Sequence, residues 1–140
     1  MSKIILTNAK VLVNSVDVST SAYSLDIQST RAEVDVSSFG DSAIEILLGL
    51  ADVSFVIGFW NDYTAAALDS QLFALHQTNT PFPVEVRPVN AARSTSNPAY
   101  FLTGALLPEY HPINGDMGAA SSTEVTFRNA NQAGLTRLTS

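Results

Sequence analysis

The two histidines of this 140-residue chain, His76 and His111, are the side chains best suited to acid–base or metal chemistry. Neither has a second ligand at the spacing of a known zinc motif, and the absence of cysteine excludes thiolate sites and disulfides. His76 falls near the end of an expected helix, where the helix dipole favours a cation. His111 falls in a loop. A structural zinc site is therefore not expected.

Carboxylates offer a second kind of chemistry, because two of them at a suitable separation can hydrolyse a glycosidic bond. Asp35 and Asp41 would be the first candidates, but we favour a solvated acidic surface. Asn114-Gly115-Asp116 resembles a fragment of a calcium loop that lacks the later carboxylates, so a tight turn explains it. Phosphate-binding glycine patterns are absent. We expect no enzyme, no metal and no cofactor.

Charge is scarce in this sequence and mostly negative. Charged residues make up 14% of the chain, against about 25% in an average soluble protein. Sixteen serines and twelve threonines take their place. Low charge on a small β-rich protein suggests that subunit contacts cover much of its surface, and a Ser/Thr-rich monomer is the alternative.

The net charge is −6, and no Lys or Arg occurs between Ala32 and Val86, a stretch with eight acids. Binding to nucleic acid relies on Lys and Arg that neutralise phosphates. The chain is therefore not expected to bind DNA, although an acidic surface would repel a polyanion and let it slide past.

Tyr63–Thr78 is the one predicted helix. Ala65, Leu68, Leu72 and Leu75 recur at steps of three and four and form one apolar stripe. Asp62 or Thr64 is expected to cap its start, while Asn79 and Pro81 end it. A helix with one apolar face needs a partner surface, which the surrounding strands would supply.

The remaining sequence shows the alternation of β-strands. Pro83 and Pro88 favour an edge position for one strand. Ala22–Ser29 and Ala32–Ser37 form either a hairpin or one long bent strand, with Tyr23, Leu25 and Ile27 on one face. Asp52–Trp60 is apolar on both faces and is expected to be central, or covered by the helix on one side. The expected strands are Ile4–Leu6, Val11–Val13, Val16–Val18, Ala22–Ser29, Ala32–Ser37, Asp52–Trp60, Phe82–Arg87, Tyr100–Leu107 and Thr123–Arg128.

Three segments are expected outside the strands. Ser37–Gly49 contains a turn, and its apolar residues Ile44, Leu47 and Leu48 form a helical turn or an apolar loop, either exposed as a contact surface or folded onto the core. Pro108–Ser122 is a long turn-rich loop. The polar tail Asn129–Ser140 is expected to be ordered only against a neighbouring subunit.

These elements predict a mainly β protein. The expected architecture is one β-sandwich or barrel-like domain, residues 1–140, of about seven strands with one flanking α-helix. The start of the chain lacks the pattern of a signal peptide, and the longest apolar stretches are too short to span a bilayer. We expect a soluble protein that is made without export.

The order of elements resembles the major tail proteins, or tail tube proteins, of long-tailed bacteriophages. The likeness covers nearly the whole chain. It lies in the opening pair KIILTNAKVLVNSVDVS, in AEVDVSSFGDS followed by LLGLADVSFVIGFW, in the lone helix before a Pro-flanked strand, and in AYFLTGALLPEYHPINGDMGAASSTEVTFRNA. The resemblance implies subunits that form rings, commonly hexamers, with the helix outside a continuous β-barrel.

In such assemblies the rings stack into a hollow tube through which the genome passes. By this resemblance the Val34–Ile44 hairpin and loop, the Pro108–Ser122 loop and the C-terminal tail would make the contacts. The residues expected at ring or stacking interfaces are Val34, Val36, Phe39, Ile44, Tyr110, His111, Ile113 and Leu135. The acidic residues expected to face the channel are Glu33, Asp35, Asp41 and Asp52.

The implied partners are further copies of the chain and other tail proteins at the tube ends. Double-stranded DNA would pass without specific binding, and no membrane is involved. The implied location is the virion tail, with the host cytoplasm during assembly. The alternatives are a tail-terminator ring, the inner tube of a contractile injection machine, or a monomeric carbohydrate-binding sandwich that uses Trp60, Tyr63, Tyr110 or Phe39.

Overall fold

The computed structural model describes residues 3–64, 67–130 and 133–140. It is mainly β with one α-helix, as the sequence predicts. Eight strands form one antiparallel sheet in the order β2-β1-β5-β6-β7-β4-β3, and β8 pairs with β6. The elements are β1 (Lys10–Val13), β2 (Val16–Asp17), a 3-10 turn (Ser19–Ser21), β3 (Ala22–Asp35), β4 (Ile46–Trp60), α1 (Leu68–His76), β5 (Phe82–Arg87), β6 (Ala99–Leu106), β7 (Ser122–Asn129) and β8 (Leu135–Leu138).

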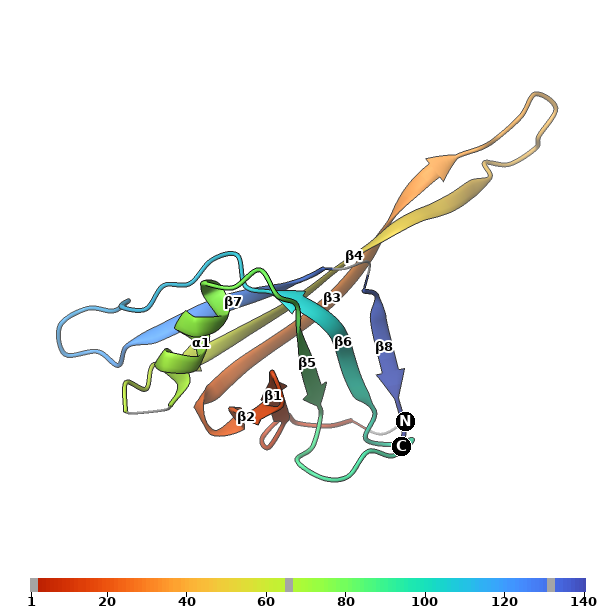
Figure 1. Ribbon diagram of the computed structural model, residues 1–140. Coiled ribbons are helices and arrows are strands. Elements are labelled where there is room, and N and C mark those ends of the chain that lie inside the picture. Colours follow the sequence, from red (N-terminus) through yellow and green to blue (C-terminus); the bar gives the residue numbers. More distant parts are fainter. Residues whose placement is uncertain (1–2, 65–66, 131–132) are drawn as a thin grey trace.

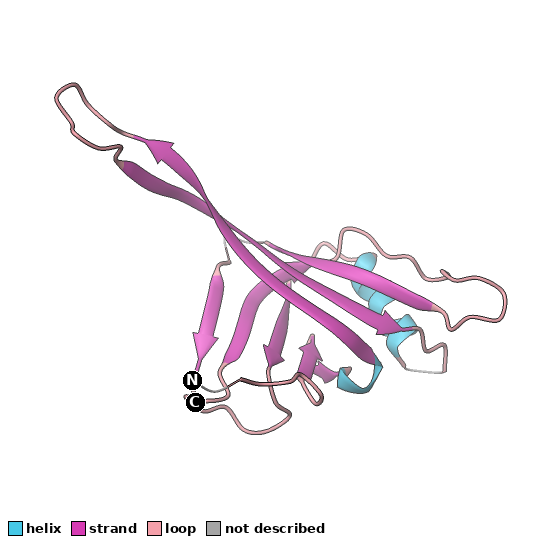
Figure 2. Ribbon diagram, turned by 180° about the vertical axis from the view of Figure 1, so that it is seen from behind, coloured by secondary structure: helices cyan, strands magenta, loops and turns pink. Residues whose placement is uncertain are grey.

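The sheet curls strongly, so that β1 and β3, far apart in the strand order, face each other across a groove (Figures 1 and 2). No ladder joins β3 to β1 or β2 within the described residues. The structure is therefore one open curled sheet, and the closed barrel and the two-sheet sandwich expected from the sequence are wrong in this detail. The groove between β1 and β3 is called the seam groove below.

The concave face of the sheet carries the core, because alternate residues of each strand point to it. Phe55, Ile57 and Phe59 of β4 are fully buried there, which confirms that this strand is central, between β7 and β3. Leu68 and Leu72 of α1 belong to the same cluster. The helix therefore packs on the concave face, with the apolar stripe that its spacing predicted.

The helix is shorter than the sequence pattern indicated. It begins at Leu68, and its N-cap residue Ala67 makes no side-chain hydrogen bond. The carboxylate of Asp62 instead accepts from the amide and hydroxyl of Thr64, at 3.1 and 2.7 Å, so neither side chain caps α1. These bonds stabilise a separate turn before the helix and lower the pKa of Asp62. The main-chain carbonyl of Asp62 does accept from the amide of Asp69 in the first turn, at 3.0 Å. Ala65 lies outside the described residues.

Strand β5 has the predicted bounds but lies inside the sheet, between β1 and β6. The edge position expected from Pro83 is therefore wrong. Pro83 lies at the register shift between Phe82 and Val84, where the ladder with β6 is interrupted and its missing N–H costs no bond. Its carbonyl still accepts from the amide of Asn14 at 2.7 Å.

Both ends of the chain differ from the expectation. Ile4–Leu6 is not a strand. The C-terminal tail is ordered against its own chain, because β8 pairs with β6 from Ala99 to Leu102. It follows β7 along the same side of β6, after an interruption near Gly104. The expectation that this tail needs a neighbour for order is therefore wrong.

The two runs Ala22–Ser29 and Ala32–Ser37 form one long strand, β3, rather than a hairpin. A bulge between Ala22 and Ser24 reverses the direction of Tyr23. Leu25 and Ile27 pack against the core, whereas the Tyr23 ring lies on the outer face, 4.5 Å from the ring of Trp60. The expected common face of Tyr23, Leu25 and Ile27 is therefore wrong.

Across the described ranges, no helix has the length and apolar character that would let it cross a membrane.

Candidate functional site

A two-stranded arm projects far from the rest of the molecule (Figures 1 and 2). Strand β4 pairs with β7 only from Ser54 onward, whereas its ladder with β3 continues to the pair Asp35–Ile46. Residues 31–51 therefore form an isolated hairpin, which we call the arm; the remaining residues are the body. An isolated hairpin is at best marginally stable in water, so an arm of this kind favours a covering partner.

The two faces of the arm differ in chemistry. Val34 lies opposite Leu47 on one face, next to Val36. The other face alternates acids with apolar residues, because Glu33 lies opposite Leu48 and Asp35 opposite Ile46. The first face is thus apolar at Val34 and Leu47, and Glu45 lies beside Val36, whose amide donates to the Glu45 carbonyl at 2.9 Å.

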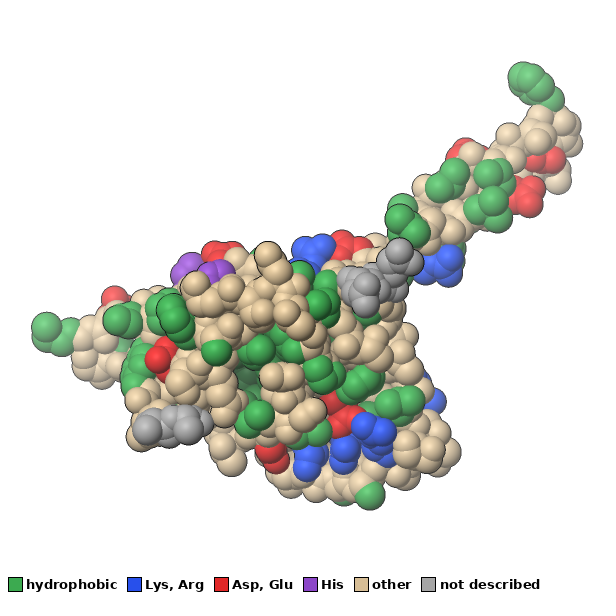
Figure 3. Space-filling view, viewed as in Figure 1, with side chains coloured by type: hydrophobic (Ala, Val, Ile, Leu, Met, Phe, Trp, Pro, Cys, Tyr) green, Lys and Arg blue, Asp and Glu red, His purple; other side chains and the backbone are tan. Residues whose placement is uncertain are grey.

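Large apolar side chains of the arm lie open to solvent on both faces and at the tip (Figure 3). Phe39 at the tip is fully exposed, at 110% of its reference area, and Leu50 is 92% exposed. Contiguous exposed apolar surface marks a contact site. The exposed large apolar residues of the arm are Val34, Val36, Phe39, Ile44, Ile46, Leu47, Leu48 and Leu50.

Hydrogen bonds give the arm a defined shape. At its base, Arg31 donates to the carbonyls of Gly49 and Leu48 at 3.0 and 3.2 Å, across the register shift. Near the tip, the amide of Glu45 donates to the hydroxyl of Ser37 at 2.7 Å. Gly40 has φ +93°, a conformation that favours glycine, and turns the chain beside Phe39. The apolar residues are therefore presented on an ordered scaffold.

Three of the four acidic candidates lie on the arm. Glu33 and Asp35 share one face, and the amide of Ser37 donates to Asp35 at 2.9 Å, which lowers the pKa of that carboxyl. Asp41 accepts from the amide of Ser38 in the tip turn. Asp52, at the arm base, instead forms an ion pair with Arg128 at 2.6 Å. Nothing in the single chain tests whether these acids face a channel.

A second projection is the long loop of residues 107–121, at the opposite side of the body from the arm (Figure 1). Its base is tied to the helix region. The Tyr110 hydroxyl donates to Asp69 at 2.7 Å, and the Tyr63 hydroxyl donates to the carbonyl of Pro112 at 2.5 Å. The tip exposes Ile113 and Met117. This loop is a second candidate contact surface.

The expected interface residues thus separate into two projections and one strand. Val34, Val36, Phe39 and Ile44 lie on the arm. Tyr110, His111 and Ile113 lie in the long loop, where His111 is 2.7 Å from Glu109 and Tyr110 packs partly against the core. Leu135 lies in β8, half-buried against the core. Their role in assembly stays a prediction.

The sequence left open whether Leu47 and Leu48 are exposed or folded onto the core, and in the structure they are exposed. Ile46, Leu47 and Leu48 belong to β4, so the expected helical turn is wrong, and they do not fold back onto the core. Three consecutive apolar residues hide the alternation of a strand, so no periodic signal marked them. Met117, fully exposed at the long-loop tip, carried no signal either.

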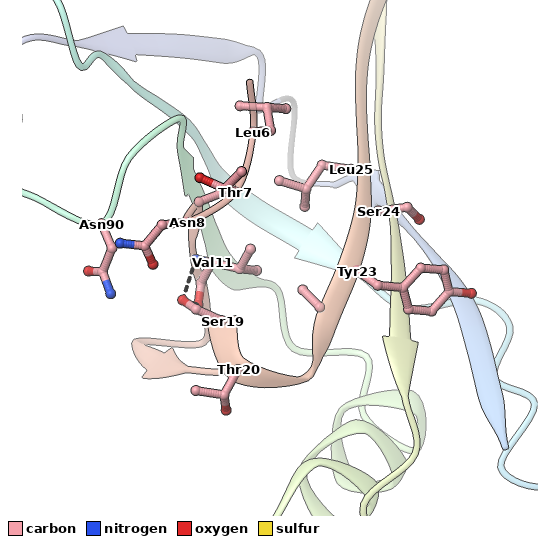
Figure 4. A pocket seen from close by; sticks show the side chains of 12 residues that line it. Leu6, Thr7, Asn8, Val11, Ser19, Thr20, Tyr23, Ser24, Leu25 and Asn90 are labelled. Carbon is pink, nitrogen blue, oxygen red and sulfur yellow. Dashed lines mark hydrogen bonds between the residues drawn. The ribbon is translucent and has the colours of Figure 1, made fainter. Parts of the chain in front are cut away.

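The seam groove opens the apolar interior beside the N-terminal segment (Figure 4). Leu6 and Leu25 point toward each other across it, while Tyr23 points away. One part has a volume of about 570 Å³ and is lined mainly by residues 6–9 and by β3. The adjoining apolar part, of about 210 Å³, is lined by Leu6, Leu25, Ile27, Val86, Arg87, Pro88 and Tyr100.

A buried ion cluster fixes the loop beside this groove. Glu85 is 2% exposed and accepts from Arg87 at 2.9 Å and from Arg93. Arg93 also donates to the carbonyl of Ser140 at 3.4 Å, which ties the C-terminus to the cluster. Asn97 bonds the main chain at Val89, Ala91 and Ala92. The guanidinium groups of this cluster are held in place at one end of the body.

In the described part of the chain, no three His, Asp or Glu side chains gather to hold a metal ion. The aromatic residues considered for carbohydrate binding also stay apart. Trp60 stacks on Tyr23, Tyr63 and Tyr110 are tied at the base of the long loop, and Phe39 lies at the arm tip. Assembly surfaces are the stronger candidates.

No protein-family model matches this sequence, and no curated protein matches it. Solved structures do share its architecture. A chain from the virion of a native gene transfer agent particle superposes with a TM-score of 0.70 at 12% identity, covering 92% of this chain and 95% of the other. A chain from the sheath–tube complex of an extracellular contractile injection system superposes with a TM-score of 0.66 at 13% identity, covering 99% of this chain and 93% of the other.

A chain from the tail of an empty gene transfer agent particle, solved with C6 symmetry, gives a TM-score of 0.61 at 15% identity, covering 92% of this chain and 94% of that one. This chain has the tail-tube fold. Chains from a tube terminator and a tube-terminating cap share the fold as well. The match spans at least 92% of this chain and at least 93% of each of these three chains, so the likeness is one of the whole fold and not of a local motif.

Proposed function

We propose that this chain is a structural virion protein whose copies form rings that stack into the hollow tail tube of a phage-like particle. The observation that carries the proposal is the near-complete fold match to tail and tube assemblies, combined with an apolar arm that the rest of the chain leaves uncovered. In this function the arm, the long loop and β8 contact other copies, and the chain acts as one tube-forming domain without catalysis.

The free strand edges support the same function. The outer edge of β3 and the outer edge of β8 carry no partner strand within the described residues. Such edges pair readily with other chains and can cause aggregation, and a closed ring removes this risk because it pairs the edges. A ring of curled sheets joined edge to edge would enclose a channel, and the six-fold symmetry of one matching tail favours six copies.

The charge pattern is compatible with passage of double-stranded DNA through the tube. With net charge −6, the chain offers little for phosphate binding, and the arm acids Glu33, Asp35 and Asp41 are exposed. We propose that some of these acids, or Asp52, face the channel. Other tail proteins would bind at the tube ends, and the protein would reside in the virion tail after assembly in the host cytoplasm.

Negative-stain electron microscopy of the purified protein over a concentration series, with parallel light scattering, tests the proposal. We expect rings or hollow tubes that grow with concentration. A terminator ring is the second candidate, favoured by the fold match to terminator and cap chains. It would form single rings that cap a tube and do not polymerise. A protein that stays monomeric at all concentrations, also with purified tail tips as initiators, would refute both.

A further inference from the structure

The apolar part of the seam groove is open because the curled sheet does not close between β1 and β3. Leu25 and Ile27 form one wall from β3, while Val86 and Tyr100 form the other. Leu6, 57% exposed, stands at the rim (Figure 4). Since six of its seven lining residues are apolar or aromatic, the groove suits an apolar side chain that arrives from outside.

The same chain presents such a side chain at the end of its arm. Phe39 is fully exposed, and the arm carries it away from the body (Figures 1 and 3). The hydrogen-bonded turn at Gly40 holds the tip in shape, so little ordering is needed for docking. Because the arm points away from the body, Phe39 cannot reach the seam groove of its own chain.

The charges of the arm and of the body are complementary, which indicates that the partner is a second copy of the chain. Between Ala32 and Leu50 the arm carries Glu33, Asp35, Asp41 and Glu45 and no Lys or Arg. The end of the body beside the groove is richer in bases. Five of them lie on the N-terminal segment, β1, β5, β8 and the loop after β5, against three acids on β2, on β5 and on the neighbouring part of β3. The bases are Lys3, Lys10, Arg87, Arg93 and Arg137, and the acids are Asp17, Asp26 and Glu85.

We propose that Phe39 of one copy inserts into the apolar part of the seam groove of another copy. The inference rests on the proposed tube function and specifies which surface receives the arm. Phe39 and the seam groove lie at different ends of one chain, so the contact is head-to-tail. Head-to-tail contacts add further copies without limit unless the copies close into a ring. Opposite charges within a Debye length of about 10 Å would steer the arm toward the groove.

Disulfide trapping tests the contact without cross-links from native cysteines, because the chain contains no cysteine. One preparation carries Phe39→Cys and a second carries Leu6→Cys; they are mixed, assembled and oxidised mildly. A disulfide needs α-carbons within about 7 Å. We expect a covalent dimer at least about fivefold above the mixture of Phe39→Cys with Ile113→Cys, a stricter control because Ile113 on the long loop is 87% exposed against 57% for Leu6.

Substitution of Phe39 gives a second test of the contact. Phe39→Ala should raise the protein concentration at which assemblies appear by roughly tenfold or more, the factor expected for one lost buried aromatic contact. Phe73→Ala is the matched control, because Phe73 is 54% exposed on α1. We expect it to leave that concentration unchanged, and circular dichroism would verify that both variants fold.

The outcomes separate the two proposals. Normal tubes without the Phe39–Leu6 cross-link, or with a stronger cross-link of Phe39 to position 113 or to another position 39, would overturn the contact and leave the tube function standing. Absence of any assembly by the unmodified chain would overturn the tube function and this contact with it.

Discussion

Val34 lies directly opposite Leu47 across the β3–β4 ladder, and the two side chains are 49% and 60% exposed. Cross-strand pairs of this kind stabilise a sheet when another layer covers them. Among the described residues no element covers this pair, so its apolar area is available to a neighbour.

The double substitution Val34→Thr with Leu47→Thr should therefore separate folding from assembly. The free energy of unfolding of the monomer should change by no more than about 0.5 kcal/mol, because both residues are exposed. Assembly should weaken by about 2 kcal/mol, roughly a thirtyfold rise in the concentration at the midpoint of light scattering. Val16→Thr, at an exposed valine of β2, is the control. An unchanged midpoint would show that this face stays free in the assembly.

The bond between Tyr110 and Asp69 gives a prediction about pH. Burial of the ring, and then the neighbouring carboxylate of Asp69, raise the pKa of Tyr110 above its usual value of 10.0. A raised pKa in the folded state stabilises the fold below the unfolded pKa, and this contribution is lost as pH rises above about 10. In the Tyr110→Phe variant, the loss of stability at high pH should be smaller.

Melting temperatures from pH 8 to pH 12 measure this effect for the unmodified chain and for Tyr110→Phe. Below pH 10 the variant should be less stable by about 1 kcal/mol, the net worth of one hydrogen bond. Tyr23→Phe, on the outer face, serves as the comparison. Parallel melting curves for all three proteins across this range would contradict a stabilising role of the Tyr110 bond.

The ion cluster at Glu85 predicts a large loss of stability. Glu85→Gln leaves Arg87 and Arg93 without their buried counter-charge, and breaking such a buried pair costs about 3 kcal/mol or more. Urea denaturation measures the change. Glu109→Gln removes a carboxylate that is exposed beside His111 and should cost less than about 0.5 kcal/mol. Equal effects of the two substitutions would mean that the cluster contributes no more than a surface pair.

Much of the fold follows from local patterns. The alternation in Phe82–Arg87 and the apolar faces of β4 gave the type and place of the core strands, because burial on one side of a pleated strand requires that period. The stripe of Leu68, Leu72 and Leu75 likewise gave the helix that covers the core. These patterns identify what each element buries.

Long-range pairing could not be obtained in this way. The sequence shows β8 only as a polar tail, because a short edge strand on β6 needs no alternation of its own. The bulge that turns Tyr23 outward depends on the ladder with β4, and Pro83 became an internal residue only through a register shift with β6. Such features are decided by partner strands, which local periodicity does not specify.

The candidate surface was predictable in part for the same reason. Phe39 was expected at an interface because the resemblance to tail tube proteins assigns the Val34–Ile44 hairpin and loop to a contact. A hairpin at Val34–Ile44 was expected, but the length of the arm was not, since the sequence does not reveal that β7 stops pairing with β4 at Ser54 while β3 continues. The exposure of Leu47 and Leu48 follows from that difference in strand length.

The acids on the arm lead to a prediction about DNA passage that rests on the proposed tube function. Glu33 and Asp35 share the face of the arm opposite Val34 and Leu47. If the apolar face docks on a neighbouring copy, the acidic face is left to point toward the channel. Glu33→Lys with Asp35→Lys should then slow genome ejection from assembled particles, because Lys binds phosphates through counterion release.

Fluorescence of released DNA measures the ejection rate, and electron microscopy first selects particles with tubes of normal length. Since phosphate contacts weaken with salt, raising the salt concentration should restore the rate toward that of the unmodified particle. The comparison is Asp26→Lys with Glu124→Lys, which makes the same charge change on exposed residues of the body. If this second pair slows ejection and the arm pair does not, the strands of the body line the channel and the arm acids face elsewhere.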